Sequence, residues 1–182
     1  NSPLNPGESV SFNISWEHNI IDAKALGGRG GYEYFAEDKN YIYEMAQWFP
    51  RMAAYTDVNG WQNKQFLGRG EFALAFGNYE VEIKVPADHL VAATGELQNA
   101  KDILSKDQRK RLESAKKASV DPIIIATAEE ANERMKGKSD KTKTWKFKAD
   151  NVRDFAFATS RRFIWDALGV PMSNGKTAMA MS

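Results

Sequence analysis

Histidine is the side chain best suited to metal binding and to proton transfer near neutral pH. This sequence contains two, His18 and His89, which lie far apart. His18 follows a predicted strand, and His89 lies in a predicted turn just after Pro86. A histidine pair that binds metal is normally adjacent on one helix or hairpin, and this spacing does not provide that. We therefore interpret both histidines as surface residues.

Other catalytic signatures are missing from the sequence. It has no H-E-x-x-H segment, no G-x-S-x-G segment and no cysteine. These are the motifs of zinc peptidases, α/β-hydrolases and cysteine nucleophiles. The adjacent Glu129 and Glu130 are better explained as the first turn of a helix, where the macrodipole favours acids, than as a catalytic pair. We expect the chain to be inactive alone and to hold no cofactor or metal.

Two patterns suggest binding to phosphate or nucleic acid, but neither fits well. A phosphate-binding loop joins a strand to a helix and carries Lys-Ser or Lys-Thr, and GGRGG at 27–31 lacks both features. Lysine and arginine cluster at 106–117 and 136–148, yet acidic residues in the same region balance them. We interpret the glycines as a tight connection and expect no nucleic-acid partner.

Tryptophan offers a third kind of binding site, because an exposed indole can stack on a sugar ring. The candidates are Trp48, Trp61 and Trp145. A buried tryptophan is more common than an exposed stacking platform. Carbohydrate or peptide binding by a β-module is therefore kept as an alternative function.

The composition is that of an ordinary globular protein. The 182 residues are 42% hydrophobic and 27% charged, with a net charge of +1, so no strong field would attract nucleic acid or an anionic membrane. No apolar run approaches the ~20 residues that span a bilayer, and no signal peptide is visible. Both ends look like cuts, so an extracytoplasmic location with the signal removed stays open.

Alternating apolar and polar residues predict strands in the first half of the chain. Residues 10–17 alternate cleanly, and 41–55 read as a strand interrupted at Pro50, followed by a turn at Asn59-Gly60. The alternation over 72–85 shifts parity at Gly77-Asn78. This shift indicates either a hairpin turn or a bulge in one long bent strand, and we prefer the bulge. Residues 90–97 follow as another strand.

The second half begins with a charged insert. Capping-box spacing at 105–108 and 127–130 predicts helices over roughly 106–118 and 128–136, with a short buried strand at 123–125 between them. Alternation returns from Trp145, and residues from Gly169 onward look like a frayed connection. We predict a β-domain core over 1–97, a charged helical insert over 98–143, closing strands over 144–170, and a truncated linker over 171–182. The predicted fold is mainly β, a saddle-like or sandwich arrangement of largely antiparallel strands with a short two-helix insert.

One run of residues carries a family resemblance. The segment AQWFPRM…YTDVNGW…FLGRGEF…FGNYEVEIKVPADHLVAATGEL resembles the N-terminal domain of aminopeptidase N-like zinc metallopeptidases, in a bacterial branch. The later TKTWKFKADNVRDFAFATSRRFIWDA is similar to the end of that domain. The characteristic features are Arg51, Asp57 six residues later, and a long strand that ends at Val85-Pro86.

The resemblance implies a non-catalytic β-domain that packs on a catalytic domain of the same polypeptide. Zinc and the general base would belong to that missing domain, and the substrate would be a peptide. In the family, a Gln or Glu just before the arginine lines the substrate pocket, and the matching positions here are Gln47 and, next, Glu44. Pro50 and Pro86 would have structural roles. We interpret Arg51 and Asp57 as a structural ion pair on neighbouring strands, and contact with the substrate is the alternative.

Overall fold

Antiparallel β-sheets form most of the computed structural model, which describes residues 3–27, 30–65, 68 and 72–182. Strands account for 38% of the chain and helices for 15%. Every pairing between named strands is antiparallel in the described residues. The predicted fold class, mainly β with antiparallel strands and a short helical insert, is confirmed.

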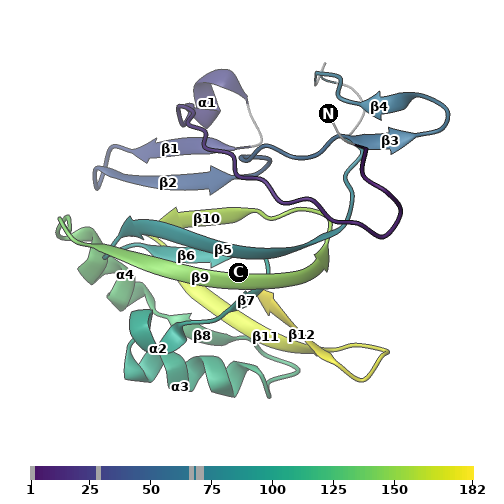
Figure 1. Ribbon diagram of the computed structural model, residues 1–182. Coiled ribbons are helices and arrows are strands. Elements are labelled where there is room, and N and C mark those ends of the chain that lie inside the picture. Colours follow the sequence, from purple (N-terminus) through teal and green to yellow (C-terminus); the bar gives the residue numbers. More distant parts are fainter. Residues whose placement is uncertain (1–2, 28–29, 66–67, 69–71) are drawn as a thin grey trace.

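The first sheet has four strands in the order β1-β2-β10-β6 (Figure 1). Their bounds are β1 Gly31–Phe35, β2 Asn40–Met45, β10 Phe157–Ser160 and β6 Leu90–Ala93. Strand β10 closes the gap between β2 and β6, which come from much earlier in the chain. This long-range pairing brings β2 beside β10, and residues of both strands line one cavity.

The second sheet has the order β5-β9-β7, so β5 and β7 are its edge strands. The bounds are β5 Gly77–Pro86, β9 Thr142–Val152 and β7 Glu96–Leu97. The pairing register of β5 with β9 shifts between Gly77 and Tyr79, so the predicted bulge is present. The strand begins only at Gly77, however. Among residues 72–76, which the prediction included in one long strand, no strand is formed.

The predicted single strand over 90–97 is also divided, into β6 and β7. Gly95 lies between them with φ of +87°, and a Cβ on it would stand 2.4 Å from the Lys148 carbonyl oxygen. Only glycine fits this close approach and this backbone conformation. The chain therefore leaves the first sheet at Gly95 and joins the second.

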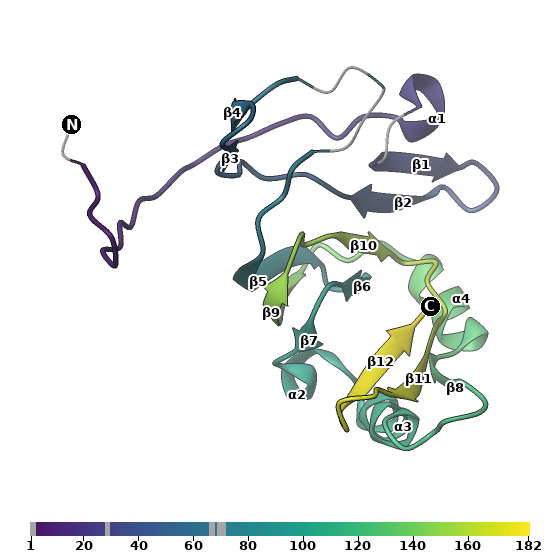
Figure 2. The ribbon, with the colours of Figure 1, turned by 90° about the vertical axis from the view of Figure 1, so that its right-hand side faces the viewer.

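The charged insert forms as predicted and packs on a third sheet. Helices α3, Lys106–Ala115, and α4, Ala128–Met135, both begin with complete capping boxes, and β8, Ile123–Ala126, lies between them. A short helix that the sequence did not suggest, α2, Ala100–Ile103, precedes them. Figures 1 and 2 show these elements gathered at one end of the molecule.

The third sheet corrects the prediction for the end of the chain. Its order is β12-β11-β8, with β11 spanning Trp165–Pro171 and β12 spanning Thr177–Met181. The frayed linker expected over 171–182 instead forms a hairpin with β11. The apolar–polar alternation in TAMAM is weak, because alanine occurs on both buried and exposed faces of a strand. The sequence therefore did not predict this strand.

The remaining elements lie at the end of the molecule opposite the insert (Figure 1). One is the short helix α1, Ala23–Leu26. The other is a hairpin formed by β3, Ala54–Thr56, and β4, Gly60–Gln62, and its turn contains the predicted Asn59-Gly60. The strand predicted over 10–17 is wrong. This segment has no ladder partner among the described residues, and Figure 2 shows it as an extended trace that runs from the projecting N-terminus toward α1. Its apolar side chains, such as Val10 and Phe12, are 66% and 58% exposed.

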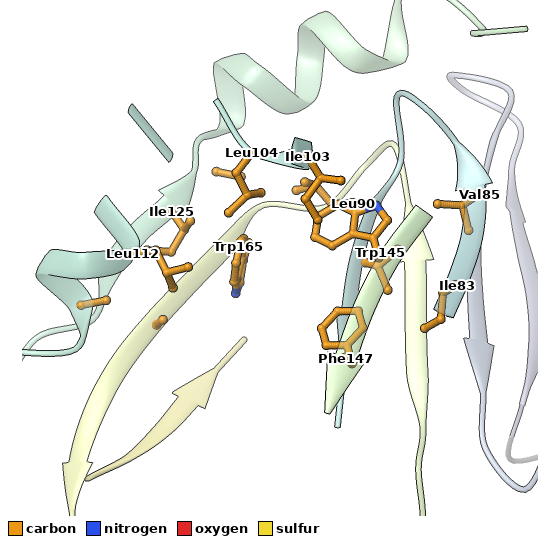
Figure 3. Close-up of a cluster of buried hydrophobic side chains, with 14 of the residues drawn as sticks. Ile83, Val85, Leu90, Ile103, Leu104, Leu112, Ile125, Trp145, Phe147 and Trp165 are labelled. Carbon is orange, nitrogen blue, oxygen red and sulfur yellow. The ribbon is translucent and has the colours of Figure 1, made fainter. Parts of the chain in front are cut away.

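One hydrophobic core joins the second and third sheets to the insert (Figure 3). Trp145 and Phe147 project from β9 and stack with ring centroids 6.3 Å apart. Trp165 from β11, Ile125 from β8 and Leu112 from α3 complete the cluster. The insert is therefore part of the folded core rather than a separate appendage.

Candidate functional site

The two predicted pocket residues, Gln47 and Glu44, lie beside one cavity of about 320 Å³, which we call the Gln47 cavity. Both side chains are exposed, and the cavity opens to solvent. Its lining residues come from the segment after residue 17, from the start of β1 and from the end of β2: His18, Asn19, Ile20, Ile21, Gly30, Gly31, Glu44, Met45, Ala46, Gln47 and Trp48.

Backbone geometry places Gln47 at the rim of this cavity. Strand β2 ends at Met45, and Gln47 follows with φ of +53°, in the left-handed region. A residue other than glycine is uncommon there, and such positions concentrate at functional sites. The left-handed turn redirects the chain away from the sheet and leaves the amide side chain exposed.

Glycines let the neighbouring segments approach closely enough to form the cavity floor. A Cβ on Gly31, whose φ is +143°, would lie 2.4 Å from the Ile21 carbonyl oxygen. A Cβ on Gly30 would lie 2.9 Å from the Glu44 carbonyl oxygen. For these two residues the tight-connection interpretation of GGRGG fits the geometry. Residues 28 and 29 of that motif lie outside the described part of the chain.

The contacts of Arg51 contradict the predicted ion pair. Its guanidinium lies 2.9 Å from the Asp154 carboxylate and also donates to the backbone oxygens of Ala75 and Arg153. Within the described structure Asp57 is an exposed turn residue without an ion pair. The predicted pairing of Arg51 with Asp57 is therefore wrong, because the arginine reaches across to the segment between β9 and β10 instead.

The two predicted structural prolines lie at the ends of strands or in connections. Pro50 is exposed in the connection between β2 and β3. Pro86 is the last residue of β5 and pairs with Thr142. Both positions suit a residue that lacks a backbone N–H.

The three candidate tryptophans differ sharply in exposure. Trp145 is 1% exposed and belongs to the core, so it cannot stack on a sugar. Trp48 is half-buried, packs against Trp16 and Phe157, and donates to the Phe155 carbonyl oxygen. Trp61 is 60% exposed on the β3–β4 hairpin, with its ring centroid 5.1 Å from that of Tyr55. Of the three, Trp61 alone is available as a platform.

His18 is exposed, as predicted, but His89 is not. His89 is 4% exposed and lines a second cavity of about 490 Å³, the His89 cavity. The cavity lies between the free edge of β5 and the β2–β10 pair, and it is lined by Ile20, Tyr41, Tyr43, Met45, Ile83, Lys84, Val85, Pro86, His89, Lys138, Phe157, Thr159 and Arg161. The sequence could not reveal this burial, because the turn after Pro86 is enclosed by strands remote in sequence.

Hydrogen bonds fix the tautomer of His89. The Thr159 hydroxyl donates to the Leu90 carbonyl oxygen at 2.8 Å, so its oxygen is free to accept from His89 Nδ1, 3.1 Å away. A proton on Nδ1 leaves Nε2 as an acceptor, and this buried atom has no hydrogen-bond partner within the described structure. Burial, with a smaller contribution from Arg161, lowers the pKa of His89 to about 4, so the ring is neutral at pH 7.

Charged groups surround the His89 cavity unevenly. Arg161, 9% exposed, forms an ion pair with Asp88 in which Nε and Oδ2 are 2.8 Å apart. Burial raises the pKa of Asp88, but Arg161 and the Ser139 amide outweigh it and the pKa is lowered overall. Lys84 and Lys138 are exposed at the cavity and have no ion-pair partner in the described structure. The cavity is therefore cationic at neutral pH.

The described residues do not fit a zinc site. No group of three or more His, Asp or Glu side chains gathers there in a way that could hold a metal ion, and the two histidines line different cavities. Of the helices described, none is long and apolar enough to span a bilayer. Zinc chemistry is thus not assigned to any of these residues.

Comparisons with protein-family models, curated proteins and solved structures found no match to this chain. The family resemblance consequently stays a hypothesis that rests on the motifs alone.

Proposed function

We propose that this chain is the non-catalytic N-terminal β-domain of a zinc aminopeptidase. In this proposal the domain packs on the catalytic domain of the same polypeptide and forms one wall of its peptide-binding pocket. Gln47 contacts the substrate, and Glu44 adds a negative charge beside it. The alternative is a module that binds carbohydrate or peptide.

The observation that carries the proposal is the meeting of Glu44 and Gln47 at one open cavity. A carboxylate and an amide oxygen are acceptors suited to the ammonium group at the N-terminus of a peptide. Both groups are exposed, so a second domain could close over them without first unfolding this one. The left-handed backbone of Gln47 supports the same role, because it holds the amide where an ordinary strand continuation would not.

The test uses Gln47→Ala in the full-length protein, assayed on aminoacyl substrates. We expect kcat/KM to fall about tenfold, which corresponds to the loss of about 1.4 kcal/mol of transition-state binding. The matched control is Gln98→Ala, which removes an exposed glutamine that only donates to the nearby Glu96 carbonyl oxygen. An unchanged kcat/KM for Gln47→Ala would remove the proposed role of this residue.

A second assay tests the assignment of the whole domain. The 182-residue chain alone should not hydrolyse aminoacyl substrates with or without added zinc, whereas the full-length protein should. Zinc-dependent hydrolysis by the isolated chain would overturn the proposal.

One observation favours the alternative function. Trp61 and Tyr55 form an exposed aromatic pair, 60% and 64% exposed, on the projecting β3–β4 hairpin. Exposed aromatic rings of this kind stack on sugars or on peptide side chains. Titration of the chain with a panel of glycans should quench tryptophan fluorescence in the wild type and not in Trp61→Ala. An absence of quenching in the wild type argues against this function.

A further inference from the structure

The His89 cavity adjoins the Gln47 cavity, with which it shares Ile20 and Met45, but its polar and charged groups differ. Its volume of about 490 Å³ is enough for a small aromatic molecule. Much of the lining is apolar, with Ile83 and Val85 from β5 and Met45 from β2. The ring of Tyr43 stacks on that of His89, with centroids 6.1 Å apart and planes 30° apart. A flat apolar ring is the shape that such walls accommodate.

The buried imidazole of His89 in this lining can accept a hydrogen bond from a ligand. His89 Nε2 is an acceptor without a partner in the described structure, and the residue is 4% exposed. Leaving a buried acceptor unpaired is unfavourable, and the hydroxyl group of a ligand would supply the missing hydrogen bond. The neighbouring Thr159 hydroxyl cannot serve, because its proton is already given to Leu90.

The charged groups at the cavity indicate that the ligand is an anion. Arg161 is already compensated by Asp88, whereas Lys84 and Lys138 lack ion-pair partners among the described side chains. Both lysines are exposed, so their charges lie near solvent while His89 lies inside. A ligand anion would therefore sit at the opening, with the hydroxyl group further in.

We propose that the His89 cavity binds a small hydroxylated aromatic carboxylic acid. The hydroxyl donates to His89 Nε2, the ring lies against Tyr43 and the β5 side chains, and the carboxylate lies near Lys84 and Lys138. This site does not rest on the aminopeptidase assignment, because its polar and charged groups, on His89, Lys84 and Lys138, do not line the Gln47 cavity and it needs no second domain.

Three probes of similar shape test the proposal by calorimetric titration of the wild-type chain. They are 4-hydroxyphenylacetate, phenylacetate, which lacks the donor, and tyramine, in which an amine replaces the carboxylate. We expect 4-hydroxyphenylacetate to bind about tenfold more tightly than phenylacetate, since one buried hydrogen bond is worth about that factor. Tyramine should bind at least tenfold more weakly because its charge is repelled.

Variants assign the binding to this cavity. In His89→Asn the amide can still donate to Thr159 but Nε2 is gone, so the preference for the hydroxyl should disappear. Replacing Lys84 and Lys138 by Gln should weaken the binding of both carboxylate probes several-fold without affecting folding. The matched control replaces Lys117 and Lys176 by Gln, two exposed lysines that do not line the cavity.

Imidazole ¹⁵N NMR of the wild-type chain provides a readout that does not depend on any variant folding. The Nε2 resonance should move when 4-hydroxyphenylacetate binds and stay unchanged with phenylacetate. Equal affinity for all three probes, binding that the Lys84 and Lys138 substitutions leave unchanged, or no binding at millimolar concentrations would each overturn the proposal.

Discussion

The side chain of His89 combines burial with a proton-accepting nitrogen, and this makes it sensitive to acid. Its neighbours include the cation Arg161, the anion Asp88 and the phenol of Tyr43. Burial and the charge of Arg161 both disfavour a positive charge on the His89 ring and lower its pKa. Asp88 favours that charge, but its effect is smaller.

This environment predicts a loss of stability in acid. The pKa of His89 is about 4 in the folded protein and about 6.5 in the unfolded chain, so the unfolded state binds more protons between these values. The free energy of unfolding should be fully retained above pH 6.5 and should fall as the pH drops to 4. The contribution from His89 is about 2–3 kcal/mol.

Urea unfolding across this pH range measures the effect. Carboxylates such as Asp88 also titrate near pH 4, so the quantity to compare is the difference between the wild type and His89→Asn. That difference should shrink steadily from pH 7 to pH 4. A difference that is constant with pH would contradict the buried neutral imidazole.

The sequence could suggest only part of the site at this scale. Gln47 and Glu44 were implied by the family resemblance alone, and both line one cavity. The role of Arg51 was misjudged, because its partner Asp154 is about a hundred residues away and no local pattern connects them. The burial of His89 was missed for the same reason, since β10 and β2 enclose it.

Among the secondary-structure elements, the helices of the insert were the most predictable. Their boundaries follow from local hydrogen bonds, and the capping boxes at Ser105 and Thr127 are visible as residue spacing. Strands were less predictable. Alternation at 10–17 indicated an apolar face, yet a strand also needs a neighbouring backbone, and alternation does not show whether one exists.

Glu130 links the two insert helices, which gives a prediction at the same scale. Its carboxylate accepts from the Thr127 amide at 3.0 Å, completing the cap of α4, and from Gln108 Nε2 of α3 at 3.1 Å. It also forms an ion pair with Arg111 of α3. Glu130→Ala should lower the free energy of unfolding by about 2 kcal/mol, because a cap and an interhelix contact are lost together.

The control for this prediction is the adjacent Glu129→Ala. Glu129 occupies the same first turn of α4 but is exposed, and its carboxylate interacts with its own backbone amide and with the Thr127 side chain rather than with α3. Its loss should therefore cost only about 0.5 kcal/mol. Chemical denaturation of both variants gives the comparison. Equal losses would mean that Glu130 does not connect α3 to α4.

At the scale of the whole molecule, the order of strands in each sheet was beyond sequence reasoning. Strand β10 joins β2 to β6, and β11 joins the last strand to the insert strand β8. These pairings bring together segments that are remote in sequence. Alternation indicates which face of a strand is buried, but it does not indicate which other strand pairs with it. The mainly β class, by contrast, required only the count of alternating segments.

The core that results is centred on Trp145, and this predicts how substitutions of tryptophan will differ. Trp145 is 1% exposed and stacks on Phe147, whereas Trp61 is 60% exposed on its hairpin. Trp145→Ala should destabilise the fold by about 3–5 kcal/mol through the cavity it leaves. Trp61→Ala should change stability by only about 0.5 kcal/mol.

Trp145→Phe separates packing from hydrogen bonding at the same position. The indole Nε1 is buried without a hydrogen-bond partner within the described structure, so phenylalanine removes an unpaired donor along with some volume. Its cost should therefore be much smaller than that of alanine, about 1 kcal/mol, because the two effects oppose each other. Denaturant unfolding monitored by far-UV circular dichroism measures all three variants. A loss for Trp145→Phe as large as that for Trp145→Ala would show that the indole N–H does have a partner and that the core depends on it.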